Sequence, residues 1–443
     1  MEKKHLQKNI SAFGALSTVM GTVIGAGVFF KTAAVVQQTQ SSAWTLLVWL
    51  IAGFLAICGG LTVAELATAI PKTGGAIRYI EETYGQLPAF LLGWAQTIIY
   101  FPANIAALSI IFSTQLINLF HLNSNWLVML SIITAASVTG LNLLGTKIAA
   151  GVQSVTLTIK LIPIALIILV GLMIPGEVSV SLFSFANQAG DVDTFTKVSG
   201  ISGALLATLF AYDGWLNVGN VAGEMKNPEK DLPKAIITGL SAVTIIYVLI
   251  NAVFLKTLPI AELAGNQNAA SDVAMTLFGS FGGKLITIGI LISVYGALNG
   301  YTMTGIRVPY ALATEGRYPF SNSFKKLSKN FSVPYVAAIT QLVIACVMMF
   351  WGTFDLLTDM LVFVMWLFNI LIFVAVFILR KKQPNLLRPY KVPLYPIVPL
   401  IAIFGGLFIL IMTLLTATKL AVTGIAITAL GIPVFYVMQR KAK

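Results

Sequence analysis

Gly21-Thr22-Val23-Ile24-Gly25-Ala26-Gly27 lies in the middle of the first long apolar stretch of the chain. Each glycine costs a helix about 1 kcal/mol relative to alanine, so three within this short motif weaken the helix there. In a bilayer, such a break survives only where the freed backbone groups face protein or a water-filled space. The motif therefore predicts a membrane helix that is interrupted at an internal, polar site.

The composition of the whole chain indicates that lipid is its main solvent. Of 443 residues, 57% are hydrophobic and 10% are charged, whereas soluble domains carry about 25% charged residues. The apolar runs are continuous and do not alternate as the strands of a membrane barrel do. We therefore expect an all-α integral membrane protein. The apolar stretch after the basic N-terminus is too long for a cleaved signal peptide, so we interpret it as the first span.

Hydropathy predicts twelve transmembrane helices. They lie near residues 12–36, 43–70, 87–117, 126–146, 152–174, 201–224, 235–257, 284–311, 334–352, 355–380, 396–417 and 419–438. All but six of the 28 lysines and arginines fall in segments that are cytoplasmic if both termini are inside. The positive-inside rule therefore predicts a multi-pass protein of the cell membrane with cytoplasmic N- and C-termini. The net charge of +12 then reflects this topology and contact with anionic membrane lipids, not nucleic acid.

The sixth predicted span contains a second irregular stretch, Phe210-Ala211-Tyr212-Asp213-Gly214-Trp215-Leu216-Asn217-Val218-Gly219. An ionisable residue such as Asp213 inside a span is a candidate functional group. Both irregular stretches lie in the first helix of a block of five spans. Paired interruptions at matching places in two halves indicate the substrate site of a secondary transporter. Gly21 and Gly25 also fit a small-residue motif for helix packing, which is the alternative interpretation of the first break.

A broken helix offers two complementary binding groups. The N-terminus of a half-helix presents unpaired N–H groups and the positive end of the helix dipole, which suit a carboxylate. The C-terminus of the other half-helix presents unpaired carbonyl groups, which suit an ammonium. The pattern therefore favours a carrier of small zwitterions such as amino acids.

The sequence gives little support to other functional classes. Its two cysteines, Cys58 and Cys346, lie in separate apolar runs, and its two histidines, His5 and His121, are far apart. We therefore predict no metal site and no cofactor. An enzyme would need a catalytic cluster and a channel would need a pore-lining repeat or charged rings. Neither pattern is found, so we expect neither an enzyme nor a channel.

Several motifs resemble, in order, the L-type amino acid transporter family of the amino acid–polyamine–organocation superfamily, and most of all its bacterial serine/threonine-type exchangers. They are residues 21–29, 65–79, 209–215, 223–228 and 299–307. The resemblance covers nearly the whole chain. It implies one transporter domain over residues 1–443 with a five-plus-five inverted repeat, in which helices 1 and 6 are broken. The repeats would span about 12–174 and 201–380, and two extra helices about 396–438.

The same resemblance implies a substrate site made largely of backbone groups. The substrate carboxylate would bind the N–H groups of Ala26 and Gly27. Its ammonium would bind carbonyl groups at Val23, Phe210 and Asp213. Phe210 would also cover the substrate as a gate.

Three further residues complete the expected site. Trp215 would shape the side-chain pocket. Lys160, in the fifth predicted span, would take the place of a coupling cation, together with Tyr247 of the seventh span. The alternative for Lys160 is an ammonium that extends to the membrane surface. Two positions depart from the family pattern, because relatives often have serine at Ala26 and many have glycine at Asp213.

The resemblance also leads to the expected function. A fixed lysine charge favours sodium-independent exchange of small or medium neutral L-amino acids by alternating access. The alternative is a proton-coupled amino acid symporter in which Asp213 or Glu65 carries the proton. Larger members of the family bind a partner subunit through a cysteine between helices three and four. Residues 121–125 contain none, so we expect a carrier without an obligate partner subunit.

Overall fold

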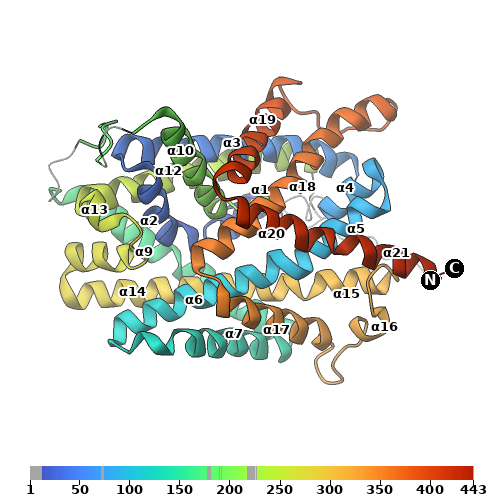
Figure 1. Cartoon of the computed structure of the whole chain (residues 1–443), viewed down its shortest axis with the longest axis horizontal. Helices are drawn as coiled ribbons and strands as arrows, with labels where there is room; N and C mark the ends of the chain where they lie inside the picture. The colour runs from blue at the N-terminus through green and yellow to red at the C-terminus, as the bar shows by residue number, and fades with distance from the viewer. Residues whose placement is uncertain are drawn as a thin grey trace.

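The computed structural model describes residues 12–70, 74–176, 181–188, 190, 192–216, 225 and 227–442. Every regular element in these ranges is a helix. Ten helical segments within them are long and apolar enough to cross a membrane, and most helices run along the long axis of the molecule (Figure 1). The prediction of an all-α membrane protein is confirmed.

The predicted spans correspond to single helices or to consecutive helices. The first five are α1 (Ala12–Val23) with α2 (Gly27–Thr39), α3 (Ser42–Ala69), α5 (Gln86–Ala95) with η1 (Gln96–Tyr100) and α6 (Phe101–Phe120), α7 (Leu127–Leu143), and α8 (Thr146–Ile159) with α9 (Leu161–Met173). The next five are α10 (Thr194–Ala211), α12 (Pro228–Thr257), α14 (Ala269–Gly305), α17 (Tyr335–Trp351) and α18 (Phe354–Lys382). The last two are α19 (Ile397–Thr416) and α20 (Thr418–Ala429) with α21 (Gly431–Ala442).

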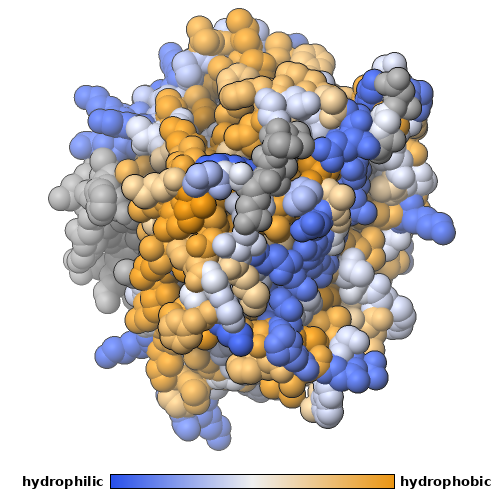
Figure 2. Space-filling model, turned by 90° about the vertical axis from the view of Figure 1, so that its left-hand side faces the viewer, coloured by the Kyte–Doolittle hydropathy of each residue, from blue (hydrophilic) through white to orange (hydrophobic). Residues whose placement is uncertain are grey.

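Short helices mark the two ends of the bundle. One end, called the α13 end below, carries α13 (Ile260–Leu263) and the described residues 181–188 between α9 and α10. The opposite end, called the α16 end, carries α4 (Gly75–Tyr84), α15 (Arg307–Thr314), α16 (Ser321–Phe324) and the end of α21 (Figure 1). Figure 2 looks onto the α13 end, where a band of hydrophilic residues crosses the surface between hydrophobic regions.

Helices α10, α12 and α14 begin well before the predicted spans, and α12 starts at Pro228 rather than at 235. α10 starts at Thr194 because Asp193 caps it, accepting hydrogen bonds from the backbone N–H groups of Phe195 (3.0 Å) and Thr196 (3.3 Å). A further hydrogen bond from the Thr196 hydroxyl lowers the pKa of Asp193. α14 starts at Ala269 and contains a kink at Gly279, whose φ of 68° suits glycine. The stretch 258–283, predicted to lie outside the membrane, is therefore partly helical.

The helices form two packed groups with the candidate site between them. In one group, α2 packs against α10, α3 packs against α12, and α1 also contacts α12. In the other, α6 packs against α7, α14 and α17, and α8 packs against α14. α18 contacts helices of both groups. The division into two inverted repeats stays a prediction. The predicted segment 217–224 lies outside the described residues, as does residue 226 of the motif at 223–228.

Candidate functional site

The first predicted break is present. α1 ends at Val23 and α2 begins at Gly27, so Ile24, Gly25 and Ala26 separate two half-helices. The Ile24 N–H still donates to the Met20 carbonyl, while the Ala26 carbonyl accepts from Phe29 and Phe30 in the first turn of α2. The break therefore places the C-terminal carbonyls of α1 beside the N-terminal N–H groups of α2.

The sixth span is also irregular where the sequence predicts it. α10 ends at Ala211, and the chain continues through turns to Leu216. Glycine lets the two breaks approach closely. A Cβ atom added at Gly27 would lie 2.5 Å from the Ala211 Cα, and one at Gly214, where φ is 107°, would lie 2.8 Å from the Thr22 carbonyl oxygen. These glycines are therefore required by packing as well as by helix interruption.

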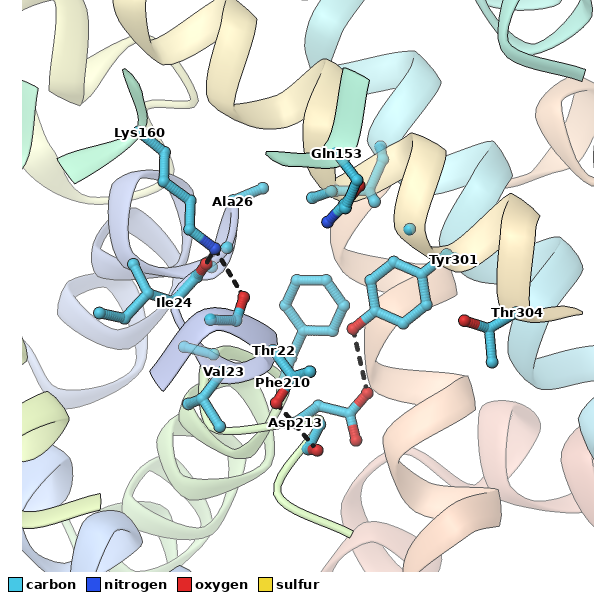
Figure 3. Close-up of a pocket in the computed structure, with 18 of the residues that line it drawn as sticks. Thr22, Val23, Ile24, Ala26, Gln153, Lys160, Phe210, Asp213, Tyr301 and Thr304 are labelled. Carbon is cyan, nitrogen blue, oxygen red and sulfur yellow. Dashed lines mark hydrogen bonds between the residues drawn. The ribbon is translucent and has the colours of Figure 1, made fainter. Parts of the chain in front are cut away.

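A cavity of about 250 Å³ lies between the two breaks and the helices that face them. Figure 3 shows how its labelled residues converge. Its polar side chains come from five parts of the chain and are Thr22, Tyr100, Gln153, Lys160, Asp213, Tyr301 and Thr304. Of the predicted substrate-binding residues, Val23, Ala26, Gly27, Phe210 and Asp213 line this cavity. In the part of the chain that the structure describes, no three histidine, cysteine or acidic side chains gather as a metal site requires.

Lys160 lies at the junction of α8 and α9, and its side chain reaches into the first break (Figure 3). Its ammonium nitrogen lies 2.6 Å from the carbonyl oxygen of Gly21 and 2.5 Å from that of Ile24. The residue is 7% exposed. The ammonium therefore binds the carbonyl end of α1, where the helix dipole favours a positive charge, and does not extend to the membrane surface.

Tyr247 of α12 connects the two breaks without lining the cavity. Its hydroxyl oxygen lies 3.0 Å from the Val23 carbonyl oxygen and 2.9 Å from the Ala211 carbonyl oxygen. The side chain is fully buried. Since a hydroxyl donates one hydrogen bond at a time, it can satisfy either carbonyl and so holds the ends of α1 and α10 together.

The surroundings of Asp213 include two residues that sequence reasoning missed. The Asp213 carboxylate accepts hydrogen bonds from the hydroxyl groups of Tyr100 and Tyr301, the latter at 3.2 Å. Tyr100 ends the π-helical turn η1, just before Pro102, whose missing N–H disturbs the helix. A carboxylate inside a span needs such donors, which is a signal in the sequence, but residue spacing does not show which hydroxyls supply them.

The two predicted aromatic residues have different positions. Phe210 lines the cavity and packs edge-on against Phe354 of α18, with ring centroids 5.8 Å apart. Trp215 is not among the cavity-lining residues. Its ring stacks on Phe373, with centroids 6.3 Å apart, and lies next to Gly59 of α3. In this structure Trp215 is thus a packing residue between α3 and α18, because the turn after α10 directs it away from the cavity.

Glu65, one of the two predicted proton carriers, lies away from the cavity near the end of α3. Its carboxylate oxygens accept hydrogen bonds from the Arg380 guanidinium at 2.8 and 2.6 Å and from the Val392 N–H at 2.8 Å. A buried carboxylate with these partners joins α3 to the end of α18.

The cavity opens toward the α16 end. Thr22 and Thr304 line its wall, and both are exposed. Thr304 lies near the C-terminal end of α14, which is the end of this helix that approaches the α16 end of the bundle. On the opposite side, Ala26, Leu108 and Phe210 are at most 5% exposed. The structure is therefore open at one end of the bundle and closed at the other.

A polar cavity at the junction of broken helices, open to one side, is typical of membrane transporters. A family model described as "Amino acid permease" matches residues 10–438. The chain therefore belongs to the amino acid permease family, whose members transport amino acids.

Individual relatives agree with this assignment. The chain is 41% identical to "Serine/threonine exchanger SteT" of Bacillus subtilis (strain 168), over 99% of each chain. It is 31% identical to the human "Cystine/glutamate transporter", over 98% of this chain and 86% of the relative. It is 30% identical to the mouse "b(0,+)-type amino acid transporter 1", over 92% of this chain and 82% of the relative. These relatives are named as transporters and exchangers, so they support a transporter rather than an enzyme.

Proposed function

We propose that this protein exchanges small or medium neutral L-amino acids across the cell membrane by alternating access, without coupling to sodium. The observation that carries the proposal is the Lys160 ammonium on the carbonyl groups of Gly21 and Ile24. Carbonyl groups of unwound helices are also the ligands that coordinate sodium in coupled carriers. A lysine bound there supplies the positive charge permanently, so no sodium ion is needed.

The substrate binds through its backbone groups. Its carboxylate accepts hydrogen bonds from Ala26 and Gly27 at the N-terminus of α2, where the helix dipole is positive. Its ammonium donates to carbonyl groups at Val23, Phe210 and Asp213. The Val23 carbonyl also lies within hydrogen-bond distance of the Tyr247 hydroxyl. A carbonyl oxygen has two lone pairs, so it can accept from this hydroxyl and from the substrate ammonium at the same time.

Cavity size and the named relatives support the substrate class. A cavity of about 250 Å³ is smaller than the roughly 300–1,000 Å³ typical of sites for drug-sized ligands. Phe210 provides an apolar wall, and the exchanger from Bacillus subtilis with 41% identity is named for serine and threonine. Small neutral amino acids fit these features best.

The topology proposed from the basic residues makes the α16 end cytoplasmic. Arg317, Lys325, Lys326 and Lys329 all lie at this end of the bundle, beside α16, as the positive-inside rule requires. The cavity then faces the cytoplasm. We further propose that the carrier works without a partner subunit, because residues 121–125 contain no cysteine for a covalent link.

Counterflow in proteoliposomes tests this function. Vesicles that contain unlabelled serine, alanine or leucine receive labelled amino acid outside, with and without sodium or a proton gradient. Exchange predicts uptake that requires internal amino acid and ignores both gradients. Sodium-dependent uptake would contradict the role of Lys160.

A second candidate, a proton-coupled symporter, rests on Asp213. Its carboxylate lies in the cavity with two tyrosine hydroxyls around it, whereas Glu65 is engaged by Arg380 outside the cavity. In the same experiment, uptake into empty vesicles driven by a proton gradient would favour this alternative.

A further inference from the structure

Lys31 is a second buried lysine, and it lies on the closed side of the cavity. It follows Gly27 by about one turn of α2, toward the α13 end, and its side chain has no solvent exposure. An ammonium buried at membrane depth is expensive unless it is paired. The partners of Lys31 therefore identify what holds this side closed.

Both partners of Lys31 come from α18. The ammonium nitrogen lies 2.8 Å from an oxygen of Asp355 and 3.1 Å from an oxygen of Asp359. The Asp355 and Asp359 side chains are 37% and 25% exposed, so water reaches the acidic side of the pair. The interaction joins α2, a half-helix that begins at the substrate cavity, to a helix that is remote in sequence.

The same ammonium also contacts the aromatic residue that covers the cavity. It lies 5.6 Å from the ring centroid of Phe210 and 5.1 Å from that of Phe354, within the range of cation–π attraction. Phe210 and Phe354 pack edge to face. Lys31 therefore links the two carboxylates on α18 to the ring that lines the cavity on its closed side.

We propose that Lys31, Asp355 and Asp359 form a latch that holds Phe210 over the cavity and closes it toward the α13 end. The α13 side cannot open between α2 and α18 while both ion pairs persist, so the latch must break whenever the cavity turns to that side. Lys31 is thus a positioning residue for Phe210. It sets the equilibrium between the state in which the cavity is open to the α16 end and the state in which it is open to the α13 end. For its effect on transport, the latch rests on the proposed exchange by alternating access.

Access to the cavity from the α13 end tests the latch without measuring transport. Ala297 lines the cavity on α14, so Ala297→Cys, in a background with Cys58→Ala and Cys346→Ala, reports access. The full-length protein in intact cells is treated with a membrane-impermeant maleimide. Lys197→Cys, exposed near the start of α10, verifies that the reagent reaches the α13 end.

Loss of the latch should raise the labelling rate of Ala297→Cys from the α13 end. For Lys31→Met we expect an increase of about 5- to 150-fold, the range that typical coupling free energies produce. Asp355→Asn, which keeps the Asp359 pair, should give an increase near the low end. Lys31→Arg should retain the slow rate, and Lys284→Met, which removes an exposed lysine from α14, should not change it.

Two results would overturn the latch. One is an unchanged labelling rate in Lys31→Met together with a lower melting temperature, which indicates a purely structural ion pair. The other is an unchanged labelling rate of Ala297→Cys in Asp355→Asn. This variant provides the test if Lys31→Met does not fold. Failure of wild-type counterflow alone would instead contradict the proposed function, because the labelling experiment does not depend on transport.

Discussion

The ammonium nitrogen of Lys160 lies 2.5 Å from the carbonyl oxygen of Ile24, the first residue after half-helix α1. This contact binds the junction of α8 and α9 to the broken part of the first span. It also neutralises the partial negative charge at the C-terminal end of α1. The broken backbone and the buried charge thus stabilise each other at the wall of the cavity.

Removal of this ammonium should impair exchange. A hydrogen bond to a charged group contributes about 1.5–3 kcal/mol, so Lys160→Ala should lower the counterflow rate by about tenfold or more. The matched control is Lys256→Ala, because Lys256 donates to the carbonyl of Ile174, at 2.5 Å, outside the cavity. Wild-type rates in Lys160→Ala, or equal losses in both variants, would contradict a specific role for Lys160.

The glycines of the first break should differ in their tolerance of a methyl group. At Gly27 the added Cβ would clash with Ala211, whereas at Gly25 its nearest neighbour is the Val23 carbonyl oxygen at 3.9 Å. Overpacking costs about 1–3 kcal/mol, so Gly27→Ala should lower the melting temperature of the purified protein and weaken amino acid binding. Gly25→Ala serves as the control and should change both far less. Equal tolerance at the two positions would argue against the close approach of α2 and α10.

The hydroxyl group of Tyr247 should matter through the two breaks that it joins. Tyr247→Phe removes a hydrogen bond worth about 1 kcal/mol and leaves a buried carbonyl without this partner. We expect slower counterflow with a modest loss of thermal stability. Tyr84→Phe is the control, since the Tyr84 hydroxyl donates to the Leu371 carbonyl at 2.7 Å, away from the cavity. If both variants lose stability but neither loses exchange, Tyr247 only supports packing.

The sequence predicted the fold and part of the site for identifiable reasons. Long apolar runs determine the spans, and the glycines from Gly21 to Gly27 mark the first break. Both the hydropathy of a run and the helix-weakening effect of glycine depend on residues that are close in sequence, so they can be predicted from it. The hydroxyl partners of Asp213 and the pairing of Lys31 with α18 depend on contacts between distant helices, which residue spacing does not encode. Trp215 illustrates the same limit, since its place in the sequence motif does not determine whether the turn after α10 directs its ring toward the cavity or away from it.

Asp213 distinguishes the two candidate functions. If the protein is an exchanger, Asp213→Asn should leave the pH profile of counterflow unchanged, because no proton moves with the substrate. A proton-coupled symporter predicts instead that this substitution flattens the profile. Tyr301→Phe, which removes one donor to Asp213 but keeps the carboxylate, is the companion variant. A flattened profile in Asp213→Asn alone would favour the symporter.

Phe210 and Trp215 should affect different properties. Trp215→Ala removes a ring stacked on Phe373, and loss of a buried aromatic side chain costs about 3–5 kcal/mol. It should therefore lower the melting temperature strongly while the ranking of serine, alanine and leucine in counterflow stays the same. Phe210→Leu changes the cavity wall itself and should alter that ranking with a smaller loss of stability. A changed ranking in Trp215→Phe, which keeps an aromatic ring in place, would show that Trp215 shapes the side-chain pocket after all.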